Sequence, residues 1–216
     1  MVRCYTVERL PDLCYTQSMI ITVASFKGGV GKTTTAVHLA TAFQQYAPTV
    51  LIDGDPNRSA TGWQQRGTLP FKVVDERQAA RYARHYDHIV IDTEARPTEQ
   101  DLQALVDGCD QLVIPTTPDA LALDALMLTV HALRTLGTDR YRVLITMIPP
   151  RPSRDGDDAR AMLVEAGIPV FASGIRRLVA FQKAALHGVP VAQVADPRAH
   201  QGWNEYQAIA EVLRGQ

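Results

Sequence analysis

A glycine-rich stretch that contains two lysines, KGGVGKTT at residues 27–34, could carry out phosphate chemistry. Glycines let the backbone turn tightly and aim successive N–H groups at phosphate oxygens. The Lys32 ammonium can reach the β- and γ-phosphates of a nucleotide, and the Thr33 hydroxyl can ligate Mg²⁺. The stretch predicts a nucleotide site made of Gly28, Gly29, Val30, Gly31, Lys32, Thr33 and Thr34.

The stretch departs in one position from the usual phosphate-loop pattern, which asks for a glycine at position 26. This chain has Phe26 there, and a second lysine, Lys27, directly before the glycine pair. Lysine is scarce in the chain, with only Lys27, Lys32, Lys72 and Lys183 among its 22 basic residues. Two of these four lysines stand in the eight-residue loop, so an incidental glycine turn is a poor explanation of the pattern.

Two acidic strand ends could supply the opposite side of such a site. Residues 49–53 form an apolar run that ends at Asp53, and Asp55 follows two residues later. Alternation along a strand places both carboxylates on one face near the carboxyl end, where open α/β sheets bind ligands. A second apolar run, at residues 88–92, ends at Asp92, which could join the Mg²⁺ shell through water. Each end alone could be an ordinary polar terminus, but beside a phosphate loop the functional interpretation is favoured.

Short β-branched runs alternate with helical patterns from Met19 onward, as repeated βαβ units require. The sequence therefore predicts an α/β fold, a doubly wound and mainly parallel sheet flanked by helices. The expected strands are Ile20–Ala24, Thr49–Asp53, Phe71–Val74, His88–Asp92, Gln111–Pro115, Arg142–Ile148 and Pro169–Ser173. The expected helices are Lys32–Gln45, Ser59–Arg66, Arg77–Arg84, Thr98–Val106, Ala120–Leu136 and Asp157–Ala166.

Length and composition are those of an ordinary globular chain. The 216 residues are 46% hydrophobic and 21% charged, which excludes a disordered or fibrous protein. Residues 1–18 show no periodicity, so we expect a loose N-terminal extension followed by a single domain over residues 19–216. No run of 18 apolar residues and no paired cysteine motif is present, which favours a cytoplasmic protein without a membrane span.

The net charge of −1 argues against a surface that is basic all over, but the charge is uneven along the chain. Residues 140–216 carry ten Arg or Lys against seven Asp or Glu. Residues 1–139 carry twelve against sixteen. The C-terminal half is therefore the place to look for a basic surface.

The loop KGGVGKTT resembles the deviant Walker A box of the ParA/MinD family of P-loop ATPases. The resemblance implies ATP and Mg²⁺ as cofactors and a homodimer that forms on ATP binding, in which Lys27 touches the partner subunit's nucleotide. Residues 53–56 resemble the family's DxDP segment, which implies that Asp55 orients the attacking water and that Asp53 lies near the phosphate-loop lysine and the metal. Thr33, Asp53 and Asp92 are then the metal-site candidates, and Lys27, Lys32 and Asp55 the catalytic ones.

The segment at residues 174–191 resembles a family segment that ends in Gly-x-Pro-Val and carries non-specific DNA-binding cations. The matching positions are Arg176, Arg177 and Lys183, although a solvated helix face would also explain them. Many relatives have an Asn that contacts adenine in the segment that corresponds to residues 146–150, and this chain has no Asn there. Backbone groups near Pro149 are then the candidates for contacts with the base. The final helix has the apolar pattern of a core-packed helix, so no membrane binding is expected.

The resemblance is greatest to small ParA-type partition ATPases and to carboxysome-positioning, McdA-like ATPases. It implies double-stranded DNA and a ParB-like or McdB-like adaptor protein as partners, and a nucleoid-associated protein. One departure is the charged stretch at residues 94–97, which follows Asp92 where relatives have small or Pro-rich residues. Two alternatives stay open: an ATP-dependent ligase of the dethiobiotin-synthetase type, and a regulatory module that binds nucleotide without hydrolysing it.

Overall fold

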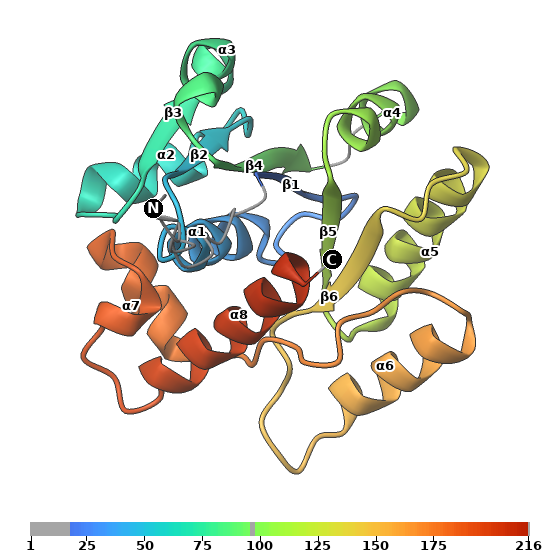
Figure 1. The fold of residues 1–216 in the computed structure, drawn as a ribbon. Helices are drawn as coiled ribbons and strands as arrows, with labels where there is room; N and C mark the ends of the chain where they lie inside the picture. Colours follow the sequence, from blue (N-terminus) through green and yellow to red (C-terminus); the bar gives the residue numbers. More distant parts are fainter. Residues whose placement is uncertain (1–17, 96–97, 216) are drawn as a thin grey trace, which may run out of the picture.

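Six parallel strands form one sheet in the order β3-β2-β4-β1-β5-β6 (Figure 1). The computed structural model describes residues 18–95 and 98–215. The strands are β1 (Met19–Ser25), β2 (Thr49–Asp53), β3 (Lys72–Asp75), β4 (His88–Ala95), β5 (Gln111–Thr116) and β6 (Tyr141–Ile145). This arrangement confirms the predicted doubly wound parallel fold. The predicted N-terminal extension falls on residues that lie, except for Ser18, outside the described part of the chain.

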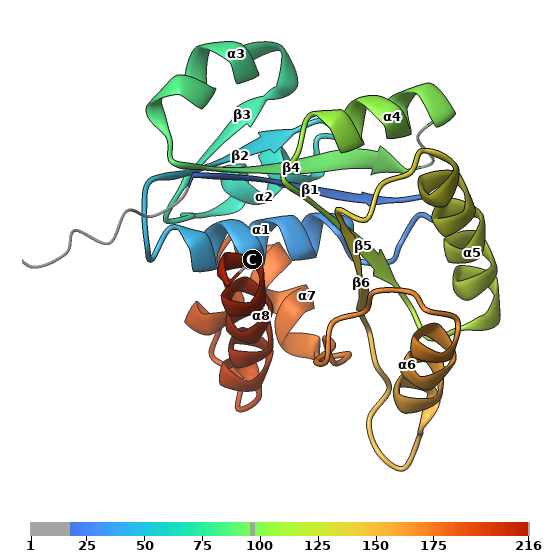
Figure 2. The ribbon, with the colours of Figure 1, turned by 45° about the vertical axis from the view of Figure 1, so that its right-hand side comes forward.

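Helices cover both faces of the sheet. Figure 2 shows α1, α7 and α8 on one side and α3 and α4 on the other. The helices are α1 (Lys32–Phe43), α2 (Ser59–Arg66), α3 (Ala79–Tyr82), α4 (Glu99–Asp107), α5 (Ala120–Thr135), α6 (Asp155–Glu165), α7 (Val179–His187) and α8 (Ala199–Arg214). Because both faces are covered, β2 is buried along its whole length and β1 is buried after its first two residues, as the continuous apolar runs predicted.

Strand β1 lies at the point where the winding of the sheet reverses. The chain runs from β1 to β2 and β3 on one side, and β5 and β6 lie on the other. In open α/β sheets the ligand crevice opens at the carboxyl ends of the strands at such a point. The residues after β1, β2 and β4 are therefore the ones that the fold brings to a ligand.

Three predicted elements differ from the structure. Pro169–Ser173 is no strand, because its pairing is limited to one bridge between Val143 and Val170. Strand β6 ends at Ile145, since Met147 takes a left-handed conformation, with φ 51°, that a strand cannot include. The expected helix Arg77–Arg84 is only four residues of α-helix between two 3₁₀ turns, Glu76–Gln78 and Ala83–His85.

The last helix, α8, packs into the core, as its apolar pattern predicted. Its buried residues are Ala199, Gly202, Trp203, Tyr206, Ile209, Ala210 and Leu213. The Tyr206 hydroxyl lies 3.1 Å from the Thr35 hydroxyl of α1, so α8 is tied to the helix that follows the glycine-rich loop. Across residues 18–95 and 98–215, the structure contains no helix with both the length and the apolar character that crossing a membrane demands.

Candidate functional site

The glycine-rich loop connects β1 to the first turn of α1. Gly29 and Gly31 have φ values of 79° and 87°, in the left-handed region that strains any residue with a Cβ. Gly31 is also the residue that precedes α1, and no side chain caps the helix there. The first N–H groups of α1 are therefore available to an anion, which the positive end of the helix also favours.

A cavity of about 370 Å³ lies over this loop. It is lined by Gly28, Gly29, Gly31, Lys32, Thr33, Thr34, Asp55, Asn57, Ser59 and Met147. The structure thus brings Asp55 together with most of the predicted loop residues. Val30 does not line the cavity: it is buried, and its carbonyl accepts a hydrogen bond of 2.7 Å from the Thr146 hydroxyl. Pro149 lies on a different cavity.

Lys32 and Thr33 line the cavity, and the buried carboxylate of Asp92 lies next to them. Burial lowers the pKa of Lys32, and the carboxylates of Asp92 and Asp55 oppose that shift. Burial raises the pKa of Asp92 to about 7, an effect that the Thr33 hydroxyl and Lys32 offset in part. The loop lysine and the strand-end carboxylate predicted from sequence are therefore electrostatic neighbours in the folded chain.

The surroundings of Asp92 show whether the residues of this site suit a magnesium ion. Asp92 is fully buried, and neither of its carboxylate oxygens has a hydrogen-bond partner among the described residues. Leaving a buried carboxylate unpaired is costly, so these oxygens suit a hydrated cation beside the Thr33 hydroxyl. The described residues contain no cluster of three His, Cys, Asp or Glu that could hold a metal without further ligands. A magnesium ion here would depend on nucleotide phosphates and water, as is usual for this metal.

Asp53 and Asp55 differ in what their carboxylates contact. Asp53 is fully buried, and its Oδ2 accepts hydrogen bonds from the Thr61 backbone N–H, at 2.8 Å, and from the Thr61 hydroxyl, at 2.6 Å. Asp53 thus ties the end of β2 to α2, and its place beside a metal stays a prediction. Asp55 accepts hydrogen bonds from the backbone and side chain of Asn57 and from the Ser59 hydroxyl, and it faces the cavity.

Sequence reasoning did not single out Asn57 and Ser59. The signal that could have found them is the spacing of Asp55, Asn57 and Ser59, because Asp side chains commonly accept hydrogen bonds from groups two and four residues later in a turn. In the structure the two residues fix the orientation of the Asp55 carboxylate.

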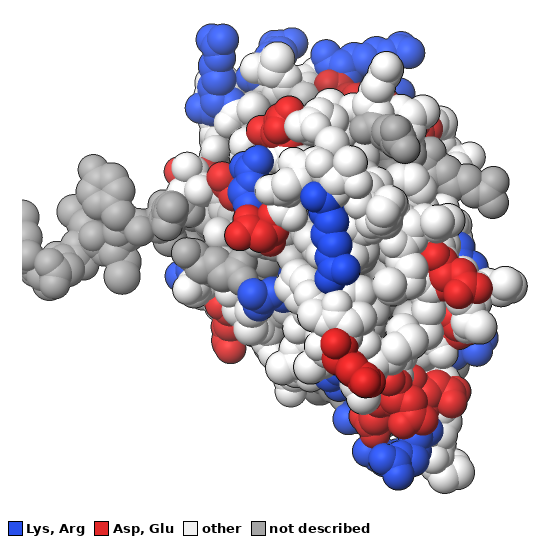
Figure 3. Space-filling model, turned by 90° about the vertical axis from the view of Figure 1, so that its right-hand side faces the viewer, with Lys and Arg blue, Asp and Glu red and all other residues white. Residues whose placement is uncertain are grey.

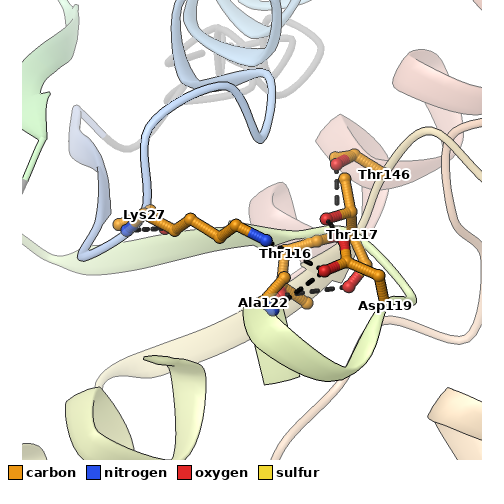
Figure 4. Close-up of polar contacts among 7 residues, drawn as sticks. Lys27, Thr116, Thr117, Asp119, Ala122 and Thr146 are labelled. Carbon is orange, nitrogen blue, oxygen red and sulfur yellow. Dashed lines mark hydrogen bonds and ion pairs between the residues drawn. The ribbon is translucent and has the colours of Figure 1, made fainter. Parts of the chain in front are cut away.

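Lys27 does not line the cavity of its own loop. Its ammonium forms an ion pair of 2.9 Å with Oδ1 of Asp119 (Figure 4). The Asp119 side chain also accepts hydrogen bonds from the backbone N–H of Ala122 and from the Thr117 hydroxyl, so it caps the start of α5. The first of these hydrogen bonds is a local capping pattern, whereas the contact with Lys27 joins residues 92 positions apart.

The three predicted DNA-binding cations are not equally free. The Arg176 guanidinium lies 3.4 Å from Oε1 of Glu205, and the Lys183 ammonium lies 2.8 Å from Oδ2 of Asp196. Arg177 has no ion-pair partner within the part of the chain that the structure describes. The local charge of this segment is therefore smaller than the sequence suggested.

A second cavity, of about 240 Å³, adjoins the first one, because Gly31, Thr34 and Met147 line both. Its other walls come from the segment after β6 and from α7 and α8: Thr146, Ile175, Arg176, Arg177, Leu178, Phe181, Gln182, Ala185 and Tyr206. A nucleotide with its phosphates on the loop would find room here for its base. Met147 and residues 175–178 line this second cavity and Pro149 does not, and a contact between the base and Pro149 stays a prediction.

Comparisons with known proteins agree with this geometry. The family model described as the CobQ/CobB/MinD/ParA nucleotide binding domain matches residues 21–191. The maintenance of carboxysome distribution protein A of Gloeobacter kilaueensis is 39% identical over 202 residues, which are 90% of this chain and 93% of that protein. The protein ParA of Rhizobium radiobacter is 30% identical over 167 residues, 70% of this chain and 75% of that protein. Among solved structures, the MinD cell division protein of Aquifex aeolicus matches in fold with a TM-score of 0.71 at 18% identity, covering 92% of this chain and 98% of that one.

Proposed function

The chain belongs to the CobQ/CobB/MinD/ParA nucleotide-binding family, as a ParA/McdA-type positioning ATPase, and on that premise we propose how it works. It binds ATP with Mg²⁺ on the glycine-rich loop and then forms a sandwich dimer. The dimer binds double-stranded DNA without sequence preference. An adaptor protein of the ParB-like or McdB-like kind stimulates hydrolysis and releases the DNA, and the cycle positions a plasmid, a chromosome or a carboxysome.

The observation that carries the ATPase proposal is that the glycine-rich loop, Lys32 and Thr33 line one cavity and that the buried Asp92 lies next to Lys32 and Thr33. The left-handed glycines and the uncapped start of α1 present N–H groups to the phosphates, and the Lys32 ammonium adds a fixed positive charge. The unpaired Asp92 carboxylate and the Thr33 hydroxyl are the residues that would hold Mg²⁺. When bound, the metal supplies positive charge that neutralises the phosphates.

In this proposal Asp55 orients the attacking water. Its carboxylate faces the cavity, and Asn57 and Ser59 hold it in one orientation. A water that Asp55 holds in this cavity would lie beside the bound phosphates, where attack on the terminal phosphoryl group is possible. The chain's own contribution to hydrolysis is then mainly positioning and charge, as in other phosphoryl-transfer sites.

Lys27 acts on the partner subunit's nucleotide in the proposed dimer. In the single chain its side chain is about one-third exposed and lies outside its own phosphate cavity. A lysine inside its own phosphate cavity could contact its own nucleotide without a dimer, whereas Lys27 lies outside that cavity. A cation delivered across the interface stabilises the charge of the transferring phosphoryl group in the manner of an arginine finger.

The experiment that tests the proposal measures DNA binding and dimerisation in three nucleotide states. Fluorescence anisotropy of labelled random-sequence duplex DNA and light scattering are recorded with ATP and Mg²⁺, with ADP, and without nucleotide. We expect dimers and salt-sensitive DNA binding with ATP alone. Binding that is equal in all three states would overturn the ATP switch. ATP consumption that requires a small carboxylic acid and ignores DNA would favour the ligase alternative instead.

A further inference from the structure

The cavity that adjoins the phosphate cavity, of about 240 Å³, combines apolar walls with a small number of polar side chains. The apolar part of its lining consists of Met147, Ile175, Leu178, Phe181 and Ala185. Such a mixture is typical of small-molecule sites, in which the few polar groups fix the orientation of the ligand. The polar side chains of the lining are those of Thr34, Thr146, Arg176, Arg177, Gln182 and Tyr206. Their partners within the chain determine which of them can bind a ligand.

The three hydroxyl-bearing side chains have other contacts or another place. The Thr146 hydroxyl donates to the Val30 carbonyl at 2.7 Å, and the Tyr206 hydroxyl lies 3.1 Å from that of Thr35. Both Thr146 and Tyr206 are buried. Thr34 also lines the phosphate cavity, so it lies on the side of the glycine-rich loop. The wall away from that loop is therefore left to the other polar side chains.

Of these, Gln182 alone can both accept and donate a hydrogen bond. Arg176 is paired with Glu205 at 3.4 Å, and the guanidinium groups of Arg176 and Arg177 have donors only. Gln182 carries an acceptor and a donor in one planar amide. This amide forms no hydrogen bond within residues 18–95 and 98–215. A ligand group that needs an acceptor can therefore find it in Gln182.

The backbone N–H groups at residues 175–177 already donate within the chain. They donate, in order, to the Ile145 carbonyl at 2.8 Å, to the Glu205 carboxylate at 2.9 Å and to the Ile148 carbonyl at 2.9 Å. Breaking such a hydrogen bond to serve a ligand would leave its former acceptor unpaired. A ligand acceptor at this wall is therefore better served by a side-chain donor.

The chemistry of adenine indicates which of its edges lies at this wall. The sugar is attached to the five-membered ring of a purine, whereas the 6-amino group is on the six-membered ring and points away from the sugar. Gly31, Thr34 and Met147 are shared with the phosphate cavity and mark the end of the base cavity near the sugar. The amino edge would then lie toward α7, which contributes Phe181 and Gln182 to the lining.

We propose that the Gln182 amide selects adenine by its 6-amino edge. Its Oε1 accepts a hydrogen bond from the amino group, and its Nε2 donates to a neighbouring ring nitrogen, which is the way glutamine pairs with adenine in DNA. The inference rests on the proposed ATP site and names the residue that reads the base there. Because Gln182 is exposed without ligand, its side chain loses freedom on binding, so the gain is modest.

The test crosses two variants of Gln182 with two nucleotides. Gln182→Met keeps the length and the helix preference of the side chain but removes both polar groups. Gln182→Glu keeps an oxygen that can accept from the amino group. The nucleotides are ADP and purine riboside 5′-diphosphate, in which hydrogen replaces the 6-amino group. Diphosphates are used because they lack the phosphoryl group that is hydrolysed and do not form the dimer in the proposed cycle.

Gln103→Met is the matched control. Gln103 belongs to α4, which lies on the right of Figure 1, the side that Figure 3 turns toward the viewer, whereas α7 lies on the left of Figure 1. The Gln103 amide donates to Asp107 at 2.8 Å, so the control also removes an amide, but one that does not line the cavity. Thermal melting establishes that all variants are folded.

Isothermal titration calorimetry with Mg²⁺ measures the dissociation constants. We expect the unmodified chain and the control to bind ADP about fivefold more tightly than the analogue, as one net hydrogen bond implies. Gln182→Met should bind both nucleotides about equally, and Gln182→Glu should keep a preference for ADP. A preference that survives in Gln182→Met, or that is lost in the control as well, would overturn the inference and leave the nucleotide site in place. So would equal binding of the two nucleotides by the unmodified chain. If the unmodified chain binds neither nucleotide, the proposed nucleotide site is wrong, and the inference with it.

Discussion

The Lys27 ammonium lies 2.9 Å from the Asp119 carboxylate, so the second lysine of the glycine-rich loop is bound to the start of α5 within its own chain. The Thr117 hydroxyl and the Lys27 ammonium hold the pKa of Asp119 below its usual range. In the proposed dimer Lys27 must leave this carboxylate before it can reach the partner's nucleotide. The ion pair therefore competes with dimer formation.

We expect Asp119→Asn to favour the ATP-bound dimer. Asn keeps the capping of α5 but loses the charge that retains Lys27. Exposed ion pairs are worth about 0.2–1 kcal/mol, and each of the two protomers gives up one such pair, so the dimer constant should rise by up to about thirtyfold. Analytical ultracentrifugation with ATP measures this constant, with Asp124→Asn, an exposed residue of the same helix, as the control. A weaker dimer in Asp119→Asn would show that Asp119 supports the interface instead.

The two lysines of the loop should have separable roles. Lys32→Ala should abolish nucleotide binding, because it removes the charge inside the phosphate cavity. Lys27→Ala should bind ATP with unchanged affinity and yet lose both dimers and hydrolysis, because Lys27 lies outside that cavity. Titration with a fluorescent ATP analogue, followed by light scattering, separates the two effects. Normal ATP-dependent dimers in Lys27→Ala would contradict a role across the interface.

Asp55→Ala should lower the hydrolysis rate by at least about a hundredfold while ATP-dependent DNA binding is kept. The reason is that Asp55 faces the cavity but makes none of the contacts that hold the loop. Ser59→Ala, which removes one of the groups that orient Asp55, should cause a smaller loss in the same direction. Phosphate release measures both rates. If the unmodified chain shows no turnover with both DNA and the adaptor protein present, it is a nucleotide-binding regulatory module.

Acid should destabilise the protein through His38. This residue is fully buried, its Nδ1–H donates to the Thr34 carbonyl at 2.7 Å, and its Nε2 accepts from the Val191 N–H at 3.0 Å. Burial lowers the pKa of His38 to about 4, whereas an unfolded histidine titrates near 6.5. Between these two pH values the unfolded chain binds a proton at His38 that the folded chain does not bind, which favours unfolding. The free energy of unfolding is therefore unaffected by His38 above pH about 6.5 and falls as the pH drops toward about 4.

The loss attributable to His38 should reach up to about 3 kcal/mol. Urea denaturation at several pH values measures it, with His38→Gln as the comparison because an amide keeps an acceptor for Val191 without titrating. The difference in unfolding free energy between the two proteins should change between pH about 6.5 and 4. A difference that is constant over this window would show that His38 is not a source of the acid sensitivity.

The sheet, the glycine-rich loop and the two acidic strand ends can be predicted from the sequence alone, because each depends on residues that are neighbours in the chain. Continuous apolar runs require a covered parallel sheet, and glycines at 29 and 31 supply the left-handed conformations that the loop contains. Parallel strands also present their carboxyl ends at one edge. For this reason the sequence alone predicts that Asp55 and Lys32 lie at one ligand site, and in the structure both line the same cavity.

The partner of each charged side chain is known only from the folded chain. Asp119 forms an ion pair with Lys27, 92 positions away, and Glu205 forms one with Arg176. The Asp53 carboxylate accepts a hydrogen bond from the Thr61 hydroxyl. No local period encodes such pairs, because they depend on how separate helices pack on the sheet. The same packing placed Gln182 of α7 on the cavity that adjoins the phosphate cavity, which no spacing in the sequence suggested. Residue type establishes what a side chain can do, but its partners in the folded chain determine whether its charge is free to do it.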